Sequence, residues 1–264
     1  MTTQGYCCQA HHMTALRETP SHRPPVLLVH GWAGSFDRTW VRGGLVDLLR
    51  DTGRDVLAFD LPGHGTATKS HDPADYADLA SSVFARLDAS SGATDAVTSS
   101  ATNTRTQPVD AIGFSLGAIT LLTAVVRAPE RFNRVVLAGI GDGVFLPHDP
   151  RRTERILAGL EGRAAPDDLT ARIFGKIGNE AHNDPLALAA VLRRPRQEPF
   201  TKDQLAAVTC EMLIAIGDKD FSQPATQLAA AFRRARLKTL TGVDHFRTPE
   251  SFDFIDAVLD FLES

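Results

Sequence analysis

The sequence has no apolar stretch long enough to cross a membrane and no excess of basic residues. Its most apolar uncharged run, 111–126, is shorter than the roughly 20 residues that a membrane-spanning helix requires, and it contains glycine, serine and threonine. There are 28 lysines and arginines against 32 aspartates and glutamates, so no positive excess is available to neutralise phosphates. We therefore expect neither a membrane nor a nucleic-acid partner.

Cysteine is also scarce. Cys7 and Cys8 are adjacent and Cys210 is far away in the chain, a spacing that forms neither a disulfide framework nor a metal-ligand motif. The first twenty residues contain no apolar stretch typical of a secretory signal. These absences lead us to expect a cytoplasmic protein without a metal or organic cofactor, and they leave the oligomeric state open.

Six short apolar or β-branched runs alternate with helical patterns along the chain. Continuous rather than alternating hydrophobicity indicates strands that are buried on both faces, as parallel strands between helices are. The sequence therefore predicts one α/β domain over 1–264, with a mostly parallel central sheet covered by helices on both faces. The expected strands are 26–30, 56–60, 109–114, 135–140, 212–217 and 237–240.

Two proline dipeptides mark the expected beginnings of long helices. Asp72-Pro73 combines a capping residue with proline at the first helical position, and Thr248-Pro249 begins the last helix in the same way. Apolar residues then recur at intervals of three and four, which predicts a buried stripe on each helix. The stripe expected for the last helix is Phe252, Ile255, Val258, Leu259 and Leu262.

Two segments interrupt the alternation of strands and helices. Residues 89–107 are rich in serine, threonine and alanine, with little that could be buried, and we expect a flexible surface loop there. Residues 142–210 lie between two expected strands and contain several short helical patterns separated by prolines. This pattern predicts a cap or lid insertion. Its basic and acidic residues are equal in number, so we expect no strongly charged substrate.

The motif Gly113-Phe114-Ser115-Leu116-Gly117 follows one expected strand and begins a helix. A serine on such a tight turn is exposed at the end of a sheet, and only glycine-sized neighbours allow strand and helix to approach closely. Ser115 is therefore the candidate nucleophile. A buried serine in a glycine-rich turn is the structural alternative.

A serine hydroxyl needs a base to remove its proton and an acid to orient that base. Asp220 follows the strand expected at 212–217, and His245 follows the next one. Because the carboxyl ends of parallel strands meet at one edge of a sheet, we expect both to approach Ser115. His64, in Leu61-Pro62-Gly63-His64-Gly65, is interpreted as part of a structural turn rather than as a second base.

Acyl transfer also requires donors for the developing oxyanion. The backbone N–H of Leu116, directly after the candidate nucleophile, is one candidate. The other is the N–H of Trp32, in the glycine-rich segment His30-Gly31-Trp32-Ala33-Gly34 after the first expected strand. The alternative for this segment alone is a simple turn, and the motif at Ser115 favours the functional interpretation.

Together these motifs resemble the α/β-hydrolase fold superfamily, of the small capped type. The resemblance covers about residues 24–264, and the matching pieces occur in the order of the family. They are His30-Gly31-Trp32, Asp60-Leu61-Pro62-Gly63-His64-Gly65, Gly113-Phe114-Ser115-Leu116-Gly117, Gly217-Asp218-Lys219-Asp220 and His245.

The resemblance implies a catalytic triad of Ser115, Asp220 and His245, with Asp220 rather than Asp218 at the acid position. It also implies an oxyanion hole formed by the amides of Trp32 and Leu116 under a cap at 142–210. One departure is Asp244, where relatives often have glycine, and its carboxylate could favour the protonated imidazole.

The candidates for substrate contact are Trp32, Phe114 and Phe246. The function expected from these residues is a serine hydrolase that cleaves a carboxylic ester or thioester of a small, mostly neutral acid through an acyl-enzyme. A C–C bond hydrolase or a haloperoxidase-like or perhydrolase-like enzyme uses similar residues, because fold alone does not separate these reactions. A slow-turnover receptor for a small ligand is the alternative from a different class.

Overall fold

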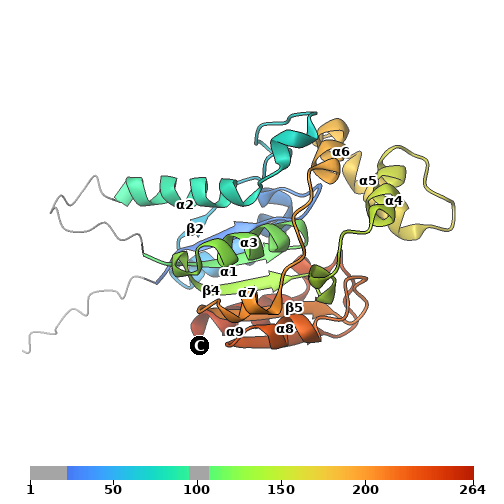
Figure 1. The fold of residues 1–264 in the computed structure, drawn as a ribbon. Coiled ribbons are helices and arrows are strands. Elements are labelled where there is room, and N and C mark those ends of the chain that lie inside the picture. Colours follow the sequence, from blue (N-terminus) through green and yellow to red (C-terminus); the bar gives the residue numbers. More distant parts are fainter. Residues whose placement is uncertain (1–22, 95–106) are drawn as a thin grey trace, which may run out of the picture.

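The computed structural model describes residues 23–94 and 107–264 (Figure 1). A single sheet of six strands has the order β2-β1-β3-β4-β5-β6, and every neighbouring pair is parallel. The parallel sheet predicted from the sequence is therefore confirmed. The strands are β1 (Val26–Val29), β2 (Val56–Leu57), β3 (Val109–Phe114), β4 (Phe132–Ala138), β5 (Glu211–Gly217) and β6 (Ala235–Leu240).

Helices cover both faces of this sheet. One face packs against α1 (Leu45–Asp51) and α9 (Phe252–Glu263), and the other against α2 (Ala80–Thr94), α3 (Leu116–Arg127) and α8 (Thr226–Ala231). Each face of the sheet has its own hydrophobic core, and alternate residues of a strand belong to one core or the other. In β1, Val26 and Leu28 pack on the first face and Leu27 and Val29 on the second. Because all four side chains are fully buried, the strand reads as one continuous apolar run.

The two proline dipeptides begin short 3₁₀ turns instead of the long helices expected from the sequence. Asp72 caps the turn η2 (Pro73–Tyr76) by accepting the N–H of Ala74, and α2 begins only at Ala80. Thr248-Pro249 lies in the turn η5 (Thr248–Glu250), after which Ser251 caps α9. The other short helices are η1 (Asp37–Val41), η3 (Pro129–Arg131) and η4 (Asp142–Phe145).

The buried face expected for α9 is corrected at its first residue. Phe252 is 84% exposed, whereas Phe254 is completely buried. Two residues along a helix correspond to a rotation of about 200°, so the side chains of Phe252 and Phe254 point to nearly opposite sides. Ile255, Val258 and Leu262 are buried as expected.

The expected flexible loop at 89–107 is also corrected at its beginning, because α2 continues to Thr94. The remainder of that segment, 95–106, lies outside the described residues, as do Cys7 and Cys8. Cys210 is described and is a buried free thiol. Among the helices that the structure describes, none is sufficiently long and apolar to span a bilayer.

A helical insertion connects β4 to β5, as the sequence predicts. It contains α4 (Pro150–Leu160), α5 (Leu169–Gly178), α6 (Pro185–Arg193) and α7 (Lys202–Ala206). In Figure 1, α4, α5 and α6 lie beyond one end of the sheet. They share a small core with Ala33 of the loop that follows β1. The helices α4 and α5 touch through Gly159 and Gly175, where an added Cβ would meet backbone atoms within 2.1 Å.

The exposure of Phe252 and the burial of Phe254 are tested by truncating these two aromatic residues separately. Phe254→Ala should lower the free energy of unfolding by about 3–5 kcal/mol because it leaves a cavity in the core. Phe252→Ala, the matched control on the exposed side, should change it by less than about 0.5 kcal/mol. Urea unfolding of both variants measures the difference, and equal losses would contradict the assignment.

Candidate functional site

Ser115 lies on the tight turn between β3 and α3. Its backbone has φ 53° and ψ −114°, a strained conformation for a residue other than glycine. The flanking glycines permit this turn, because a Cβ on Gly117 would lie 2.2 Å from the Val29 carbonyl oxygen and one on Gly113 would lie 2.8 Å from Ala118. The two glycines of the motif are thus explained by the close approach of α3 to the strands.

A chain of hydrogen bonds connects the three residues that the sequence singled out. Ser115 Oγ is 2.9 Å from His245 Nε2, and His245 Nδ1 is 2.9 Å from Asp220 Oδ2. An ionised carboxylate only accepts hydrogen bonds, so Nδ1–H donates to Asp220 and Nε2 is left to accept the serine proton. Asp220 Oδ1 accepts the N–H of Ser222 at 2.7 Å, which fixes the carboxylate. Asp220 and His245 are both 4% exposed.

The two neighbouring aspartates have other partners. Asp218 Oδ1 accepts the N–H of Gly242 at 2.8 Å, and Asp244 Oδ1 accepts the N–H of Arg247 at 3.0 Å. Both carboxylates therefore stabilise loops. The hydrogen bonds of the imidazole go to Asp220 and Ser115 instead.

The loop after β1 packs directly on the turn that carries Ser115. A Cβ on Gly31 would lie 2.9 Å from the Phe114 ring, so only glycine lets this loop come so close. Within the described residues, the N–H groups of Trp32 and Leu116 donate no hydrogen bond, and both residues line the same cavity as Ser115. The Trp32 indole N–H donates to the carbonyl of Leu188 in α6 at 3.1 Å, which ties this loop to the insertion.

His30 and His64 are both completely buried next to the loop that follows β1. His30 accepts the N–H of Leu61 at 3.0 Å through Nε2, and its Nδ1 lies 2.8 Å from the carbonyl of Gly31. The His64 ring packs edge-on against it at 5.2 Å. Burial, together with the nearby His30, lowers the pKa of His64 to about 3. A histidine that is fully enclosed and neutral fits a structural role, as expected for this turn.

Aromatic rings surround the imidazole, but not all of them face the cavity. Phe114 lies 5.0 Å and Phe246 5.7 Å from the His245 ring, between ring centroids. Neither residue is part of the cavity wall, which contains Phe174 and Phe221 instead. The expected substrate contacts at Phe114 and Phe246 stay predictions, and in this structure both rings pack around His245. Phe221 directly follows Asp220 and could have been found from the sequence, whereas Phe174 comes from the insertion without a motif.

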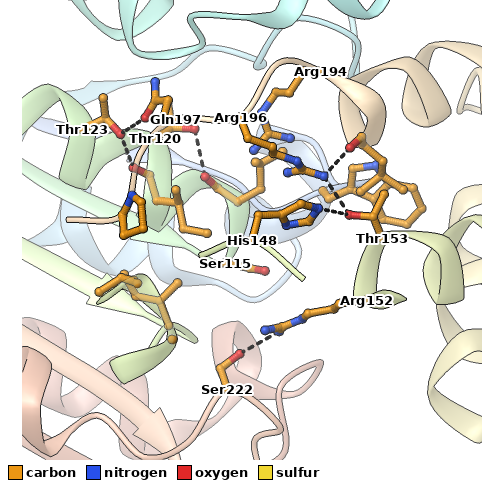
Figure 2. Close-up of a pocket in the computed structure, with 18 of the residues that line it drawn as sticks. Ser115, Thr120, Thr123, His148, Arg152, Thr153, Arg194, Arg196, Gln197 and Ser222 are labelled. Atoms are coloured by element: carbon orange, nitrogen blue, oxygen red, sulfur yellow. Dashed lines mark hydrogen bonds between the residues drawn. The ribbon is translucent and has the colours of Figure 1, made fainter. Parts of the chain in front are cut away.

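A cavity of about 410 Å³ opens beside Ser115. Its walls come from α3, the loop after β4, helices α4 and α5, and the segment that follows α6 (Figure 2). Sequence reasoning missed the basic residues of this wall, because counting the charges of the insertion does not show which of them face inward. They are His148, Arg152, Arg194 and Arg196.

The comparisons with known proteins agree with this geometry. A family model described as the alpha/beta hydrolase family matches residues 26–257. The chain belongs to the alpha/beta hydrolase family. No curated protein sequence matches this hydrolase significantly.

Several solved structures share the fold of this hydrolase. An enol-lactonase from Burkholderia xenovorans LB400 has a TM-score of 0.68 at 19% identity, with 94% of each chain covered. A thermophilic esterase from Thermogutta terrifontis has a TM-score of 0.65 at 19% identity, covering 91% of this chain and 89% of the esterase. A 2-hydroxy-6-oxo-6-phenylhexa-2,4-dienoate hydrolase from Rhodococcus sp. strain RHA1 has a TM-score of 0.63 at 21% identity, with 92% and 91% covered. At these identities the likeness concerns the fold alone.

Within the described part of this hydrolase, no group of three or more histidine, cysteine, aspartate or glutamate side chains could hold a metal ion.

The buried state of His64 should make stability depend on pH. The unfolded chain takes up a proton near pH 6.5, whereas folded His64 stays neutral down to about pH 3. The unfolded state thus binds more protons in this range, and the free energy of unfolding falls as the pH falls from above 6.5 towards 3. His64 should account for about 2 kcal/mol of the loss between pH 7.5 and 5.0.

Urea unfolding at pH 7.5 and 5.0 measures this loss. His64→Asn retains a donor for the carbonyl of Pro62 but cannot take up a proton, so its loss over the same range should be smaller by that amount. An equal loss in the wild type and the variant would contradict the assignment.

Proposed function

We propose that the protein is a serine hydrolase that cleaves a carboxylic ester or thioester through an acyl-enzyme on Ser115. The observation that carries this proposal is the continuous hydrogen-bond chain from Ser115 Oγ through His245 to Asp220. The adjoining cavity of about 410 Å³ is within the usual size of small-molecule sites.

In the first half of the reaction, Ser115 Oγ attacks the carbonyl carbon of the substrate while His245 Nε2 takes the hydroxyl proton. Asp220, hydrogen-bonded to Nδ1–H, stabilises the imidazolium that forms. The N–H groups of Trp32 and Leu116 donate to the oxyanion of the tetrahedral intermediate. When the intermediate collapses, the alcohol or thiol leaves with the proton from Nε2, and the acyl group stays on Ser115.

In the second half, a water molecule enters the place of the leaving group. His245 Nε2 takes one of its protons while the oxygen attacks the acyl carbon. The second tetrahedral intermediate is held by the same two N–H groups. Its collapse breaks the bond to Ser115 Oγ, which regains a proton from Nε2, and the free acid departs.

Other reactions remain as alternatives on the same residues. C–C bond hydrolysis and haloperoxidase-like or perhydrolase-like chemistry use a similar triad. One structurally similar protein is a 2-hydroxy-6-oxo-6-phenylhexa-2,4-dienoate hydrolase. A slow-turnover receptor would show a ligand-induced rise in melting temperature with turnover near zero. Accumulation of an acyl-enzyme in a burst with activated esters favours the ester class.

Hydrolysis of 4-nitrophenyl acetate, butyrate and octanoate tests the proposal. Ser115→Ala should lose at least about a thousandfold in kcat, because it lacks the nucleophile. Asp220→Asn should lose on the order of 10³–10⁴-fold, because the amide no longer stabilises the required tautomer and the imidazolium.

Asp218→Asn is the matched control for the aspartate variant. It retains an oxygen that can accept the N–H of Gly242, so its kcat should stay within about threefold of the wild type, because Asp218 contacts neither His245 nor Ser115. If Ser115→Ala retains turnover, or if Asp218→Asn loses as much as Asp220→Asn, the proposed triad is wrong.

A further inference from the structure

One wall of the cavity beside Ser115 is strongly basic. Arg152 extends from α4, His148 from the segment before it, and Arg194 and Arg196 from the segment that follows α6. In Figure 2, Ser115 appears in projection between His148 and Arg152, with Arg196 above them. Arg194 is half-buried, and the other three side chains are exposed within the open cavity.

None of the three arginines of this wall forms an ion pair with a carboxylate among the described residues, although the charge of Asp220 acts on Arg152 from a longer distance. Some arginines of the insertion that lie outside the cavity do have one: Arg155 pairs with Asp168, and Arg193 pairs with Glu161, whereas Arg151 and Arg172 form no ion pair with a described residue. The insertion as a whole is electrically balanced, but its paired charges lie away from the cavity. The wall therefore carries an excess of positive charge that the sequence count did not show.

The guanidinium groups are held in place by neutral partners. Arg196 donates to the Thr153 hydroxyl at 2.7 Å, and His148 Nε2 lies 3.1 Å from the same oxygen. Arg194 donates to the carbonyl of Val191 at 2.7 Å. Because each guanidinium has five N–H donors in a fixed fork, donors remain for a ligand after these bonds are made.

The positive charges are crowded. Burial, together with the neighbouring charge of Arg196, lowers the pKa of Arg194 to about 10, so this group is still protonated at neutral pH. Two acidic residues also line the cavity, Asp149 and Glu198. Asp149 caps the beginning of α4, and its carboxylate accepts the backbone N–H of Arg151. No ion pair connects Glu198 to a described residue.

The basic wall is next to the expected reaction centre. The Arg152 guanidinium lies 5.1 Å from the centroid of the Phe221 ring, and that ring lies 4.3 Å from the His245 ring. Arg152 also donates to the hydroxyl of Ser222 at 3.4 Å, a residue whose N–H binds Asp220. An anionic group bound here would thus be separated from the triad by one aromatic ring.

We propose that the cavity binds substrates that carry an anionic group, a carboxylate or a phosphate, besides the bond that is cleaved, and that Arg152, Arg194 and Arg196 bind this group. Guanidinium forks suit both anions because each presents oxygens in a matching geometry. The inference rests on the proposed hydrolase function and replaces the expectation of a mostly neutral acid. The carboxylate or phosphate of the substrate would balance the positive charge of these arginines.

Two pairs of esters of matched size test the proposal on the acyl side and on the leaving-group side. The first pair is 4-nitrophenyl hydrogen adipate and 4-nitrophenyl hexanoate, and the second is 4-acetoxybenzoate and 4-acetoxybenzamide. In at least one pair the wild type should hydrolyse the anionic ester with a kcat/KM about tenfold higher or more, because hydrogen bonds between charged groups are stronger than those between neutral groups. This preference should shrink as salt is added.

Arg152→Gln and Arg196→Gln should reduce the preference for the anionic ester about tenfold, mainly through the KM of that ester, because the amide keeps a polar contact without the charge. Arg155→Gln is the matched control, since Arg155 also lies on α4 but pairs with Asp168 outside the cavity. Equal rates for both members of each pair in the wild type, or the same loss in the Arg155 control, would overturn the anionic subsite while leaving the hydrolase in place.

A binding measurement tests the anionic subsite independently of ester hydrolysis. Calorimetric titration of Ser115→Ala with pentanoate, butyl phosphate and the neutral pentanamide needs no turnover. At least one anion should bind, the amide should not, and Arg152→Gln in the same background should weaken the anion about tenfold. The anion that binds more tightly identifies the preferred group. Binding of all three ligands alike, or of none, would reject the subsite even if the esterase activity were absent.

Discussion

The site depends on the close contact between the carboxyl end of β1 and the beginning of α3. Gly117 lies so near the Val29 carbonyl oxygen that a Cβ would approach within 2.2 Å, and this proximity forces Ser115 into its left-handed conformation. Such backbone strain costs on the order of 1–3 kcal/mol, and the buried strands on either side offset it. The loop with Trp32 also packs on this turn through Gly31, so the proposed nucleophile and the two proposed oxyanion donors line the same cavity.

The parallel sheet and the insertion make different contributions. Parallel strands end at a common edge, so the loops after β5 and β6 bring Asp220 and His245 to Ser115 across long stretches of sequence. The insertion after β4 adds the outer wall of the cavity, with Phe174 and the basic side chains. The sheet thus positions the proposed triad, and the insertion forms the part of the cavity wall to which we attribute substrate preference.

The sequence predicted most of the sheet and the three residues of the proposed triad, because apolar strands and the positions directly after them are local signals. It misplaced one aromatic residue of α9: the helix begins at Phe252, directly after the cap at Ser251, and Phe252 is exposed while Phe254 is buried. It also missed the charged wall. Arg152 and Arg155 are three residues apart on α4, and only the fold shows that one lines the cavity while the other pairs with Asp168.

The central claim is that Ser115 is a nucleophile activated by His245. Peptide mapping by mass spectrometry after reaction with a fluorophosphonate tests it most directly, because the reagent forms a stable bond with an activated serine whatever the natural substrate is. The account predicts one adduct, on the peptide that contains Ser115, and labelling that is at least a hundredfold slower in His245→Ala, as expected when a general base is lost. An adduct on a different residue, or equally fast labelling of His245→Ala, would contradict it.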